Sequence, residues 1–242
     1  MREDKIIEVK KIKKICRKNN ILNIDNFSVL KNKINFIIGG NGSGKTSLLN
    51  ILSLVDHDFE GELYYRGKKI DKAEENLELR RKFSVIWQDP YLYRGSVFYN
   101  IALPLKLRDK CQETIKKKVD RISKKLEIES LLEQSVQTLS GGERQKTSIA
   151  RALITEPEIL FVDEATTNLD EESIQFFNSH FADLVTEEMT VVMVSHDRRQ
   201  IKQLADYITL LRQGEVEVTK EINHFNFQLF GAGIEAPVAE LV

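Results

Sequence analysis

The sequence predicts an α/β protein with a mainly parallel sheet, and two observations support this prediction. The first is a set of five short apolar runs, each of the length of a buried strand, at Ile34–Ile38, Val85–Trp87, Ile159–Val162, Val191–Val194 and Tyr207–Leu211. The second is that helical periods lie between these runs. Strands that alternate with helices form parallel sheets whose two faces are covered.

Two of the helical periods are well marked. Apolar residues three or four positions apart occur at Ile115, Val119, Ile122 and Leu126, and again at Ile174, Phe177, Phe181 and Leu184. The stretch from about Tyr91 to Gln137 contains helical segments and charged runs without a convincing buried strand. We therefore expect a helical lobe inserted into the α/β core.

Composition excludes several classes of protein. The 242 residues carry 36 Lys and Arg against 37 Asp and Glu, so no overall field favours nucleic acid or an anionic membrane. Cys16 and Cys111 lie far apart without a CxxC pair, which argues against a disulfide framework or a zinc site and favours a reducing cytosolic compartment. The N-terminus lacks the apolar core of a signal peptide, and no apolar run approaches the ~20 residues that cross a bilayer.

A glycine-rich stretch, GGNGSGKT at Gly39–Thr46, follows the first apolar run and precedes the helical segment SLLNILSL. Small residues let backbone N–H groups surround a phosphate, while Lys45 neutralises its oxygens and Thr46 ligates magnesium. The alternative, a flexible strand-to-helix turn, does not require a lysine at the start of the helix. The residues expected to contact the nucleotide are Gly39, Gly40, Asn41, Gly42, Ser43, Gly44, Lys45, Thr46 and Ser47.

Two carboxylates follow the third apolar run, in the segment ILFVDE. Asp163 is placed for the outer shell of magnesium, and Glu164 can orient or deprotonate a water that attacks the γ-phosphate. Alone, this pair could equally open a solvated loop. Its occurrence downstream of a phosphate loop favours the catalytic interpretation.

A second helix start lies at Leu139–Leu153, which reads LSGGERQKTSIARAL. The Ser140 hydroxyl and the flexible Gly141 and Gly142 precede a helix whose N-terminus attracts anions. Ser140 and Glu143 also have the spacing of a capping box, and the two interpretations are compatible.

The segments GGNGSGKT, LSGGERQ, ILFVDE and VMVSHD, in this order, resemble those of the ATP-binding subunits of ABC transporters. The resemblance covers about Ile6 to Glu217. It implies a P-loop NTPase core with a mainly parallel sheet, an antiparallel N-terminal β subdomain and an α-helical subdomain inserted at about 90–155. The cassette would span residues 1–220, and the role of the tail at 221–242 is unassigned.

The resemblance also implies that two cassettes pair head to tail around ATP and Mg²⁺. Ser140, Gly141 and Gly142 would then contact the nucleotide held by the partner cassette, and Asp170 would cross between the two. Gln88 would sense magnesium and the attacking water, and His196 would contact the γ-phosphate. The implied catalytic residues are Glu164, His196 and Gln88, and the implied metal-binding residues are Thr46, Gln88 and Asp163.

Two departures from the family pattern affect these expectations. The family stacks adenine on an aromatic residue upstream of the phosphate loop, but the corresponding segment here reads KKICRKNN. Adenine would then lie near Ile15 or Cys16, with weak base selectivity. Lys146 replaces the arginine that usually follows LSGGERQ, which keeps the charge and loses the planar fork.

The resemblance further implies the partners and the location of the protein. Tyr91, Leu92 and Tyr93 lie where the family receives its membrane subunit, although they could instead pack within the lobe. We expect a second identical cassette, a membrane permease and, through it, a solute-binding protein, with the chain on the cytoplasmic face and no nucleic-acid partner. The sequence of this segment resembles that of importer cassettes for oxyanions such as tungstate or phosphate.

Two other functions remain as alternatives at this stage. A non-transport soluble ABC ATPase, of the scaffold or cluster-assembly type, would share the same motifs. A metabolic kinase that used only the phosphate loop would leave LSGGERQ and His196 without a role.

Overall fold

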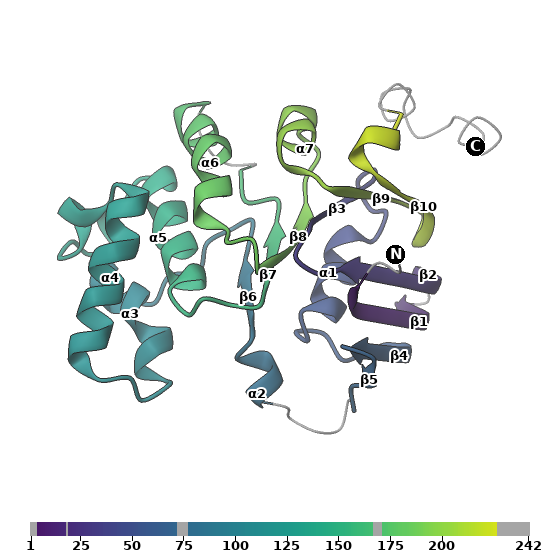
Figure 1. The fold of residues 1–242 in the computed structure, drawn as a ribbon, viewed down its shortest axis with the longest axis horizontal. Coiled ribbons are helices and arrows are strands. Elements are labelled where there is room, and N and C mark those ends of the chain that lie inside the picture. The colour runs from purple at the N-terminus through teal and green to yellow at the C-terminus, as the bar shows by residue number, and fades with distance from the viewer. Residues whose placement is uncertain (1–3, 18, 72–76, 167–170, 227–242) are drawn as a thin grey trace. The chain divides into compact units, whose positions relative to one another are not determined.

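The computed structural model describes residues 4–17, 19–71, 77–166 and 171–226 (Figure 1). The chain divides into two compact units, of which the first comprises residues 1–77 and 190–242 and the second residues 78–189. Both units combine helices with strands. The predicted α/β class is therefore confirmed.

The first unit contains an antiparallel sheet near the N-terminus. Its strands are β1 (Lys5–Cys16), β2 (Asn19–Leu30), β4 (Glu60–Tyr65) and β5 (Lys68–Lys69), in the order β2-β1-β4-β5. Apolar residues at alternate positions are buried, among them Val9 at 1% and Leu22 at 0% exposure. This sheet is the predicted antiparallel N-terminal subdomain.

The same unit contains the strands β3 (Ile34–Ile38), β8 (Thr190–Val194), β9 (Tyr207–Arg212) and β10 (Glu215–Glu221). Strand β3 pairs in parallel with both β8 and β9, and β10 closes the edge antiparallel to β9. The helices of this unit are α1 (Lys45–Leu52) and α7 (Arg198–Leu204), with a 3₁₀ turn at Ile222–His224. The three apolar runs predicted as strands in this part of the chain are confirmed.

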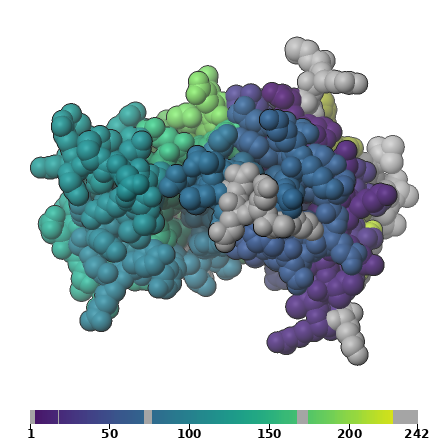
Figure 2. Space-filling model, turned by 90° about the horizontal axis from the view of Figure 1, so that it is seen from below, coloured from purple at the N-terminus to yellow at the C-terminus, as the bar shows by residue number. Residues whose placement is uncertain are grey.

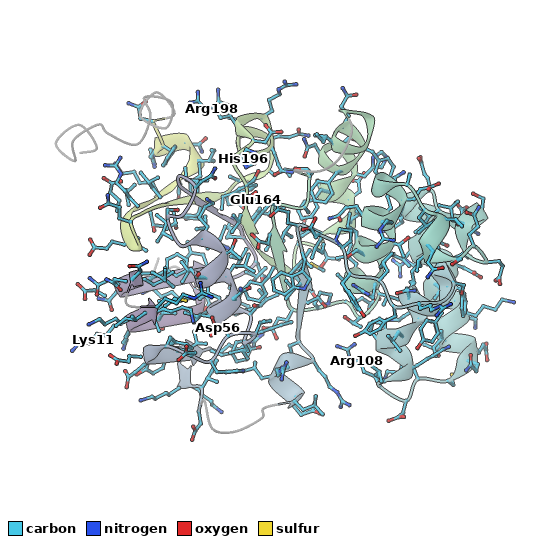
Figure 3. The ribbon with its side chains drawn as sticks, turned by 180° about the vertical axis from the view of Figure 1, so that it is seen from behind. Lys11, Asp56, Arg108, Glu164, His196 and Arg198 are labelled. Atoms are coloured by element: carbon cyan, nitrogen blue, oxygen red, sulfur yellow. The ribbon has the colours of Figure 1, made fainter. Side chains whose placement is uncertain are left out.

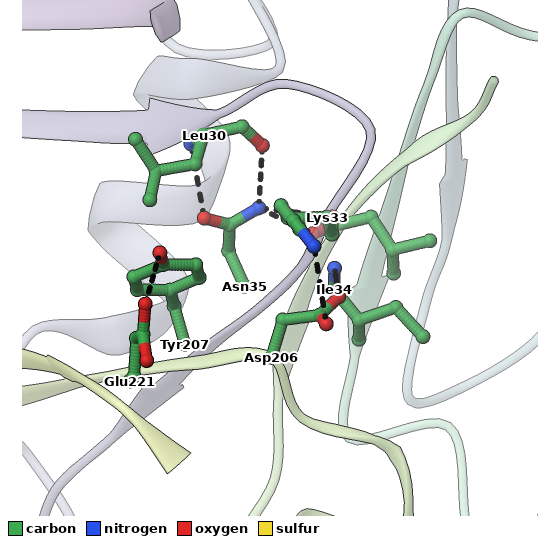
Figure 4. Close-up of polar contacts among 8 residues, drawn as sticks. Leu30, Lys33, Ile34, Asn35, Asp206, Tyr207 and Glu221 are labelled. Carbon is green, nitrogen blue, oxygen red and sulfur yellow. Dashed lines mark hydrogen bonds and ion pairs between the residues drawn. The ribbon is translucent and has the colours of Figure 1, made fainter. Parts of the chain in front are cut away.

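Polar contacts fix the start of β3 (Figure 4). The side chain of Asn35, which is 5% exposed, accepts a hydrogen bond from the N–H of Leu30 at 3.0 Å and donates to the carbonyl of Leu30 at 2.9 Å. The carboxylate of Asp206 accepts from the N–H of Ile34 at 2.8 Å. These bonds hold the strand that leads into the phosphate loop.

The second unit contains the parallel pair β6 (Phe83–Ile86) and β7 (Ile159–Asp163). Its helices are α2 (Leu77–Arg80, which begins at the last residue of the first unit's N-terminal span), α3 (Val97–Lys106), α4 (Gln112–Leu126), α5 (Gly141–Leu153) and α6 (Glu171–Leu184). Short 3₁₀ turns lie at Glu129–Leu131 and Val136–Thr138. The strand predicted at Val85–Trp87 begins earlier and ends one residue sooner.

Helix α4 shows how far the apolar period fixes the buried face. Ile115, Val119 and Leu126 are at most 1% exposed, as the period predicts. Ile122 is only half-buried, and its neighbour Ser123 is 0% exposed and donates to the carbonyl of Asp120 at 3.1 Å. Helices α3, α4 and α5, whose surface is teal in Figure 2, lie in the stretch assigned to the helical lobe. The limits of that lobe remain a prediction.

Candidate functional site

The loop between β3 and α1 requires glycine at two positions. Gly39 has φ 155°, and a Cβ there would lie 2.1 Å from the carbonyl oxygen of Leu211. Gly44 has φ 99°, and a Cβ there would lie 2.7 Å from the side chain of Leu22. The loop is therefore packed against β2 and β9, and side chains are excluded from it by close backbone approach.

Lys45 folds back over this loop. Its side chain is buried, with the residue 7% exposed, and its Nζ donates to the carbonyls of Gly39 at 3.1 Å and Gly40 at 3.0 Å. The N-cap of α1 is Gly44, which has no side chain to accept from the first N–H groups of the helix. A buried ammonium beside an uncapped helix N-terminus is a site for an anion.

The remaining residues of the loop surround this position. Asn41, Gly42 and Thr46 are exposed, and Gly40 and Ser47 are half-buried. Ser43 Oγ is buried and has no hydrogen-bond partner among the described residues. Such an orphan hydroxyl calls for a polar partner that the described chain does not supply.

His196 lies at the same strand edge as the phosphate loop. Strands β3 and β8 are parallel, with Ile37 opposite Val194, so the segments that follow them leave the sheet side by side. Ser195 Oγ accepts from the N–H of Asp197 at 3.1 Å, and Asp197 caps α7. This turn holds His196 exposed between the strand and the helix (Figure 3).

In the second unit, Gln88, Asp163 and Glu164 also lie at the ends of two neighbouring parallel strands. Strands β6 and β7 are parallel, with Ile86 opposite Val162, so Gln88 and the Asp163–Glu164 pair follow neighbouring strand ends. Asp163 is 4% exposed, and Glu164 is half-buried with φ 42°. Carboxylate and amide oxygens are ligands that suit Mg²⁺.

The second helix start, at α5, carries the capping box that the sequence predicts. Ser140 Oγ accepts from the N–H of Glu143 at 3.3 Å, and the Glu143 carboxylate accepts from the N–H of Ser140 at 2.8 Å. Ser140 and Gly141 are exposed and Gly142 is half-buried. Asp170, the residue expected to cross between cassettes, lies outside the described residues.

Sequence analysis missed the residue that shapes the segment Tyr91–Tyr93. Asn100 on α3 is 0% exposed, accepts from the N–H of Tyr93 at 2.7 Å and donates to its carbonyl at 2.8 Å. The rings of Tyr91 and Tyr93 meet edge to face at 5.3 Å, with 67% and 47% exposure, whereas Leu92 is buried. An amide inside the apolar run VFYNIAL was the available signal.

None of the helices in the described part of the chain is both long enough and apolar enough to cross a membrane.

Comparison with known proteins places these motifs in one family. The family described as "ABC transporter" matches residues 22–167. A tungstate uptake system ATP-binding protein, TupC of Peptoclostridium acidaminophilum, is 36% identical over 211 residues, which cover 87% of this chain and 96% of that protein. The methionine import ATP-binding protein MetN of Francisella tularensis is 32% identical over 91% of this chain, which spans 65% of that relative.

A solved structure agrees with these relatives. The dimeric ATP-binding cassette MJ0796, in a post-hydrolysis state with ADP and Pi, superposes with a TM-score of 0.81 at 27% identity. The match covers 90% of this chain and 99% of that one.

Proposed function

The chain belongs to the ABC transporter family, and from this premise we propose that it is the ATP-hydrolysing subunit of a membrane importer. The observation that carries the proposal is the loop at Gly39–Lys45, where the buried Lys45 ammonium donates to the carbonyls of Gly39 and Gly40 and the helix N-cap makes no side-chain hydrogen bond. A triphosphate is the ligand that this loop suits. ATP would displace the loop carbonyls as partners of the Lys45 ammonium.

The first unit supplies the contacts to the phosphates. The backbone N–H groups from Gly39 to Ser47 would donate to the phosphate oxygens, and Lys45 would neutralise the β- and γ-phosphates. His196 leaves the same strand edge and would donate to the γ-phosphate as it is transferred. These roles orient the nucleotide and disperse the charge of the transition state.

The second unit supplies the groups for hydrolysis. The predicted metal ligands are Gln88 and Asp163 of this unit and Thr46 of the first unit; they would hold Mg²⁺, whose charge would offset that of the phosphates. Glu164, next to Asp163 at the carboxyl end of β7, would take the proton of the attacking water. Gln88, at the end of the neighbouring strand, would hold that water in line.

A second cassette would complete each site. The solved relative MJ0796 is a dimer with ADP and Pi. In the proposed pair, Ser140, Gly141 and Gly142 of one chain contact the γ-phosphate held by the other, and Asp170 crosses between the two chains. Closure of the pair and binding of two nucleotides then become one event.

A separate permease would carry the solute across the bilayer. The segment Tyr91–Tyr93 presents two exposed rings on a backbone that Asn100 holds by hydrogen bonds. Rigid exposed aromatics are typical anchors of protein interfaces. We assign this segment to contact with the permease, which would place the chain on the cytoplasmic face of the membrane.

The relatives suggest the kind of cargo. TupC is named for tungstate uptake and MetN for methionine import. We propose import, with an oxyanion as the cargo and a solute-binding protein that delivers it to the permease. The cassette itself would not contact the cargo.

Replacement of Glu164 by Gln tests the proposed function. The variant keeps its size and polarity but cannot accept a proton, so we expect kcat for ATP hydrolysis to fall by about 100-fold or more. ATP should convert the variant from monomer to a stable dimer in light scattering, while ADP should not. A variant that hydrolyses ATP at the wild-type rate would contradict the assignment of the base.

Isolation of the tagged chain from its native membranes tests the transport role. We expect a polytopic membrane protein to co-purify with the wild-type chain, and less of it with a Tyr91→Ser/Tyr93→Ser double variant. Purification of an active ATPase without any membrane protein would favour a soluble ABC ATPase instead.

A further inference from the structure

The N-terminal turns of α5 lie beside a small cavity in the second unit. Gly142, Gln145 and Lys146 of α5 line it together with Phe176 and Phe177 of α6. Gln145 is 1% exposed, and neither atom of its amide has a hydrogen-bond partner among the described residues. This face of α5 therefore gains no polar anchor from Gln145.

Lys146 provides the polar contact that its neighbour lacks. Its Nζ lies 3.5 Å from the centroid of the Phe176 ring and 4.0 Å from the carboxylate of Glu127, the C-cap of α4. The Lys146 side chain is only 21% exposed, so its charge is partly shielded from water. A cation over an aromatic ring becomes more favourable as the pair is desolvated.

The Phe176 ring is itself held in place. It stacks on the imidazole of His180 with centroids 4.2 Å apart and planes inclined by 18°. His180 Nδ1 lies 3.0 Å from the carbonyl of Phe176 and 3.0 Å from Ser179 Oγ. One face of a ring accommodates one close partner, so the ammonium and the imidazole occupy opposite faces.

We propose that Lys146 is a positioning residue for the Ser140–Gly142 segment and acts through Phe176. The segment and Lys146 lie on one helix, α5, and the contact with Phe176 ties this helix to α6 within one or two turns of Gly142. The tie limits rotation of α5 and presents the segment in the orientation that the partner's nucleotide requires. This inference rests on the proposed function, because it needs a nucleotide shared between two cassettes.

The chemistry of the contact sets what can replace it. Methionine at position 146 keeps the length of the lysine side chain and packs on the Phe176 ring without a charge. An arginine keeps the charge and can also stack its planar guanidinium on the ring. Replacement of Phe176 by Leu removes the ring and keeps an apolar side chain. Lys146→Met and Phe176→Leu each remove one partner of the same cation–π contact, so their effects should not add.

ATP-driven dimerisation of the Glu164→Gln chain is the main measurement. In that background, we expect Lys146→Met to raise the ATP concentration for half-maximal dimerisation by about fivefold, the effect of a partly desolvated cation–π pair. Phe176→Leu should act alike, and the double variant should be no worse than either single variant. Lys146→Arg should restore dimerisation to the level of the Lys146 chain.

Two further readouts separate positioning from loss of structure. Binding of a fluorescent ATP analogue to the monomer should be unchanged in Lys146→Met. In the Glu164 chain, kcat should fall and the KM for ATP should rise by about fivefold, in step with dimerisation. The matched control is Lys106→Met, which removes a cation 5.2 Å from the Tyr99 ring on α3 of the same unit. It should leave dimerisation and kcat as they are.

The outcomes distinguish this inference from the proposed function. If Glu164→Gln with Lys146 intact fails to dimerise with ATP, the shared site itself is wrong. If that chain dimerises and Lys146→Met dimerises equally well, only the role of Lys146 is wrong. A loss in Lys146→Met that Lys146→Arg does not restore, or that lowers monomer binding equally, would also overturn it.

Discussion

Two helix N-termini in this protein are predicted to bind phosphate, and the structure shows that they are capped differently. Helix α1 begins at Gly44 with no side-chain cap and with the buried ammonium of Lys45 close by. Helix α5 begins at Ser140 with a complete capping box, in which Glu143 places a carboxylate at the helix N-terminus. The first start is open and positive, whereas the second already has two backbone N–H groups, those of Ser140 and Glu143, bonded to its own side chains.

The difference explains why one helix start can bind nucleotide alone and the other cannot. An anion at α1 gains the helix N–H groups and a full positive charge. An anion at α5 must displace the Glu143 carboxylate from the N–H of Ser140 and the Ser140 hydroxyl from the N–H of Glu143, so its gain is smaller. We therefore expect α1 to hold ATP in the monomer, and α5 to contribute only when closure delivers a phosphate already bound.

Replacement of Lys45 by Ala should have the largest effect, because it removes the positive charge beside the N-terminus of α1. We expect nucleotide affinity of the monomer to fall by about 100-fold, since a hydrogen bond to a charged group contributes up to about 3 kcal/mol. Isothermal titration with ATP and with ADP would measure this. Lys11→Ala, which removes an exposed lysine of the same unit (Figure 3), is the control and should bind normally. If Lys45→Ala bound ATP as tightly as the wild-type chain, the Lys45 charge would not explain why α1 binds nucleotide and α5 does not.

Replacement of Ser140 by Ala should have a smaller effect of a different kind. The ATP concentration for dimerisation of the Glu164→Gln chain should rise by about tenfold, because one hydrogen bond to a charged phosphate is lost. Affinity of the monomer for ATP should not change, in contrast to the Lys45 variant. Equal losses of monomer affinity in both variants would show that the two helix starts do not act at separate steps.

The loss of the cap has to be separated from the loss of the phosphate contact. Removal of an N-cap serine destabilises a protein by about 1 kcal/mol, which lowers Tm by about 2–4 °C in a chain of this size. Ser96 caps α3 in the same unit by accepting from the N–H of Tyr99 at 3.1 Å. Ser96→Ala should therefore lower Tm similarly and leave dimerisation unchanged.

The sequence predicted the elements whose residues lie together in the chain. The apolar runs of β3, β7, β8 and β9 were assigned as strands, and the capping box at Ser140 was identified, because each depends on local patterns. Strands β1 and β2 were not assigned from periodicity. Their lysines and asparagines obscure the alternation, and both carry register shifts that break the period of two.

Some side-chain contacts could not be predicted from the sequence alone. The amide inside VFYNIAL marks Asn100 as unusual but does not identify its partner, the backbone of Tyr93. No local pattern pairs Lys146 with Phe176, because that contact depends on the packing of α5 against α6. The sequence shows lysine at position 146 where the family usually has arginine, but the consequence of this change depends on the position of the Phe176 ring. The roles assigned to the site residues remain predictions that the variants above test.

The smallest expected effect concerns the base that the α1 site accepts. Ile15 and Cys16 end β1 and pair with Asn20 and Asn19, and Leu22, which follows on β2, packs against Gly44 of the phosphate loop. Leu22 pairs with Lys14, so the strand pair contacts the loop one residue before Ile15, which is 52% exposed.

An aliphatic side chain contacts adenine and guanine about equally, so we expect the wild-type KM values for ATP and GTP to agree within about threefold. Ile15→Tyr should add a stacking ring and lower the KM for ATP by about fivefold, the effect of about 1 kcal/mol. Ile15→Leu, which adds no ring, is the control. Because the phosphate contacts of α1 are unchanged, kcat should stay the same in all three chains. A wild-type preference for ATP above about tenfold would show that another part of the chain contacts the base, and that the α1 site recognises more than the phosphates.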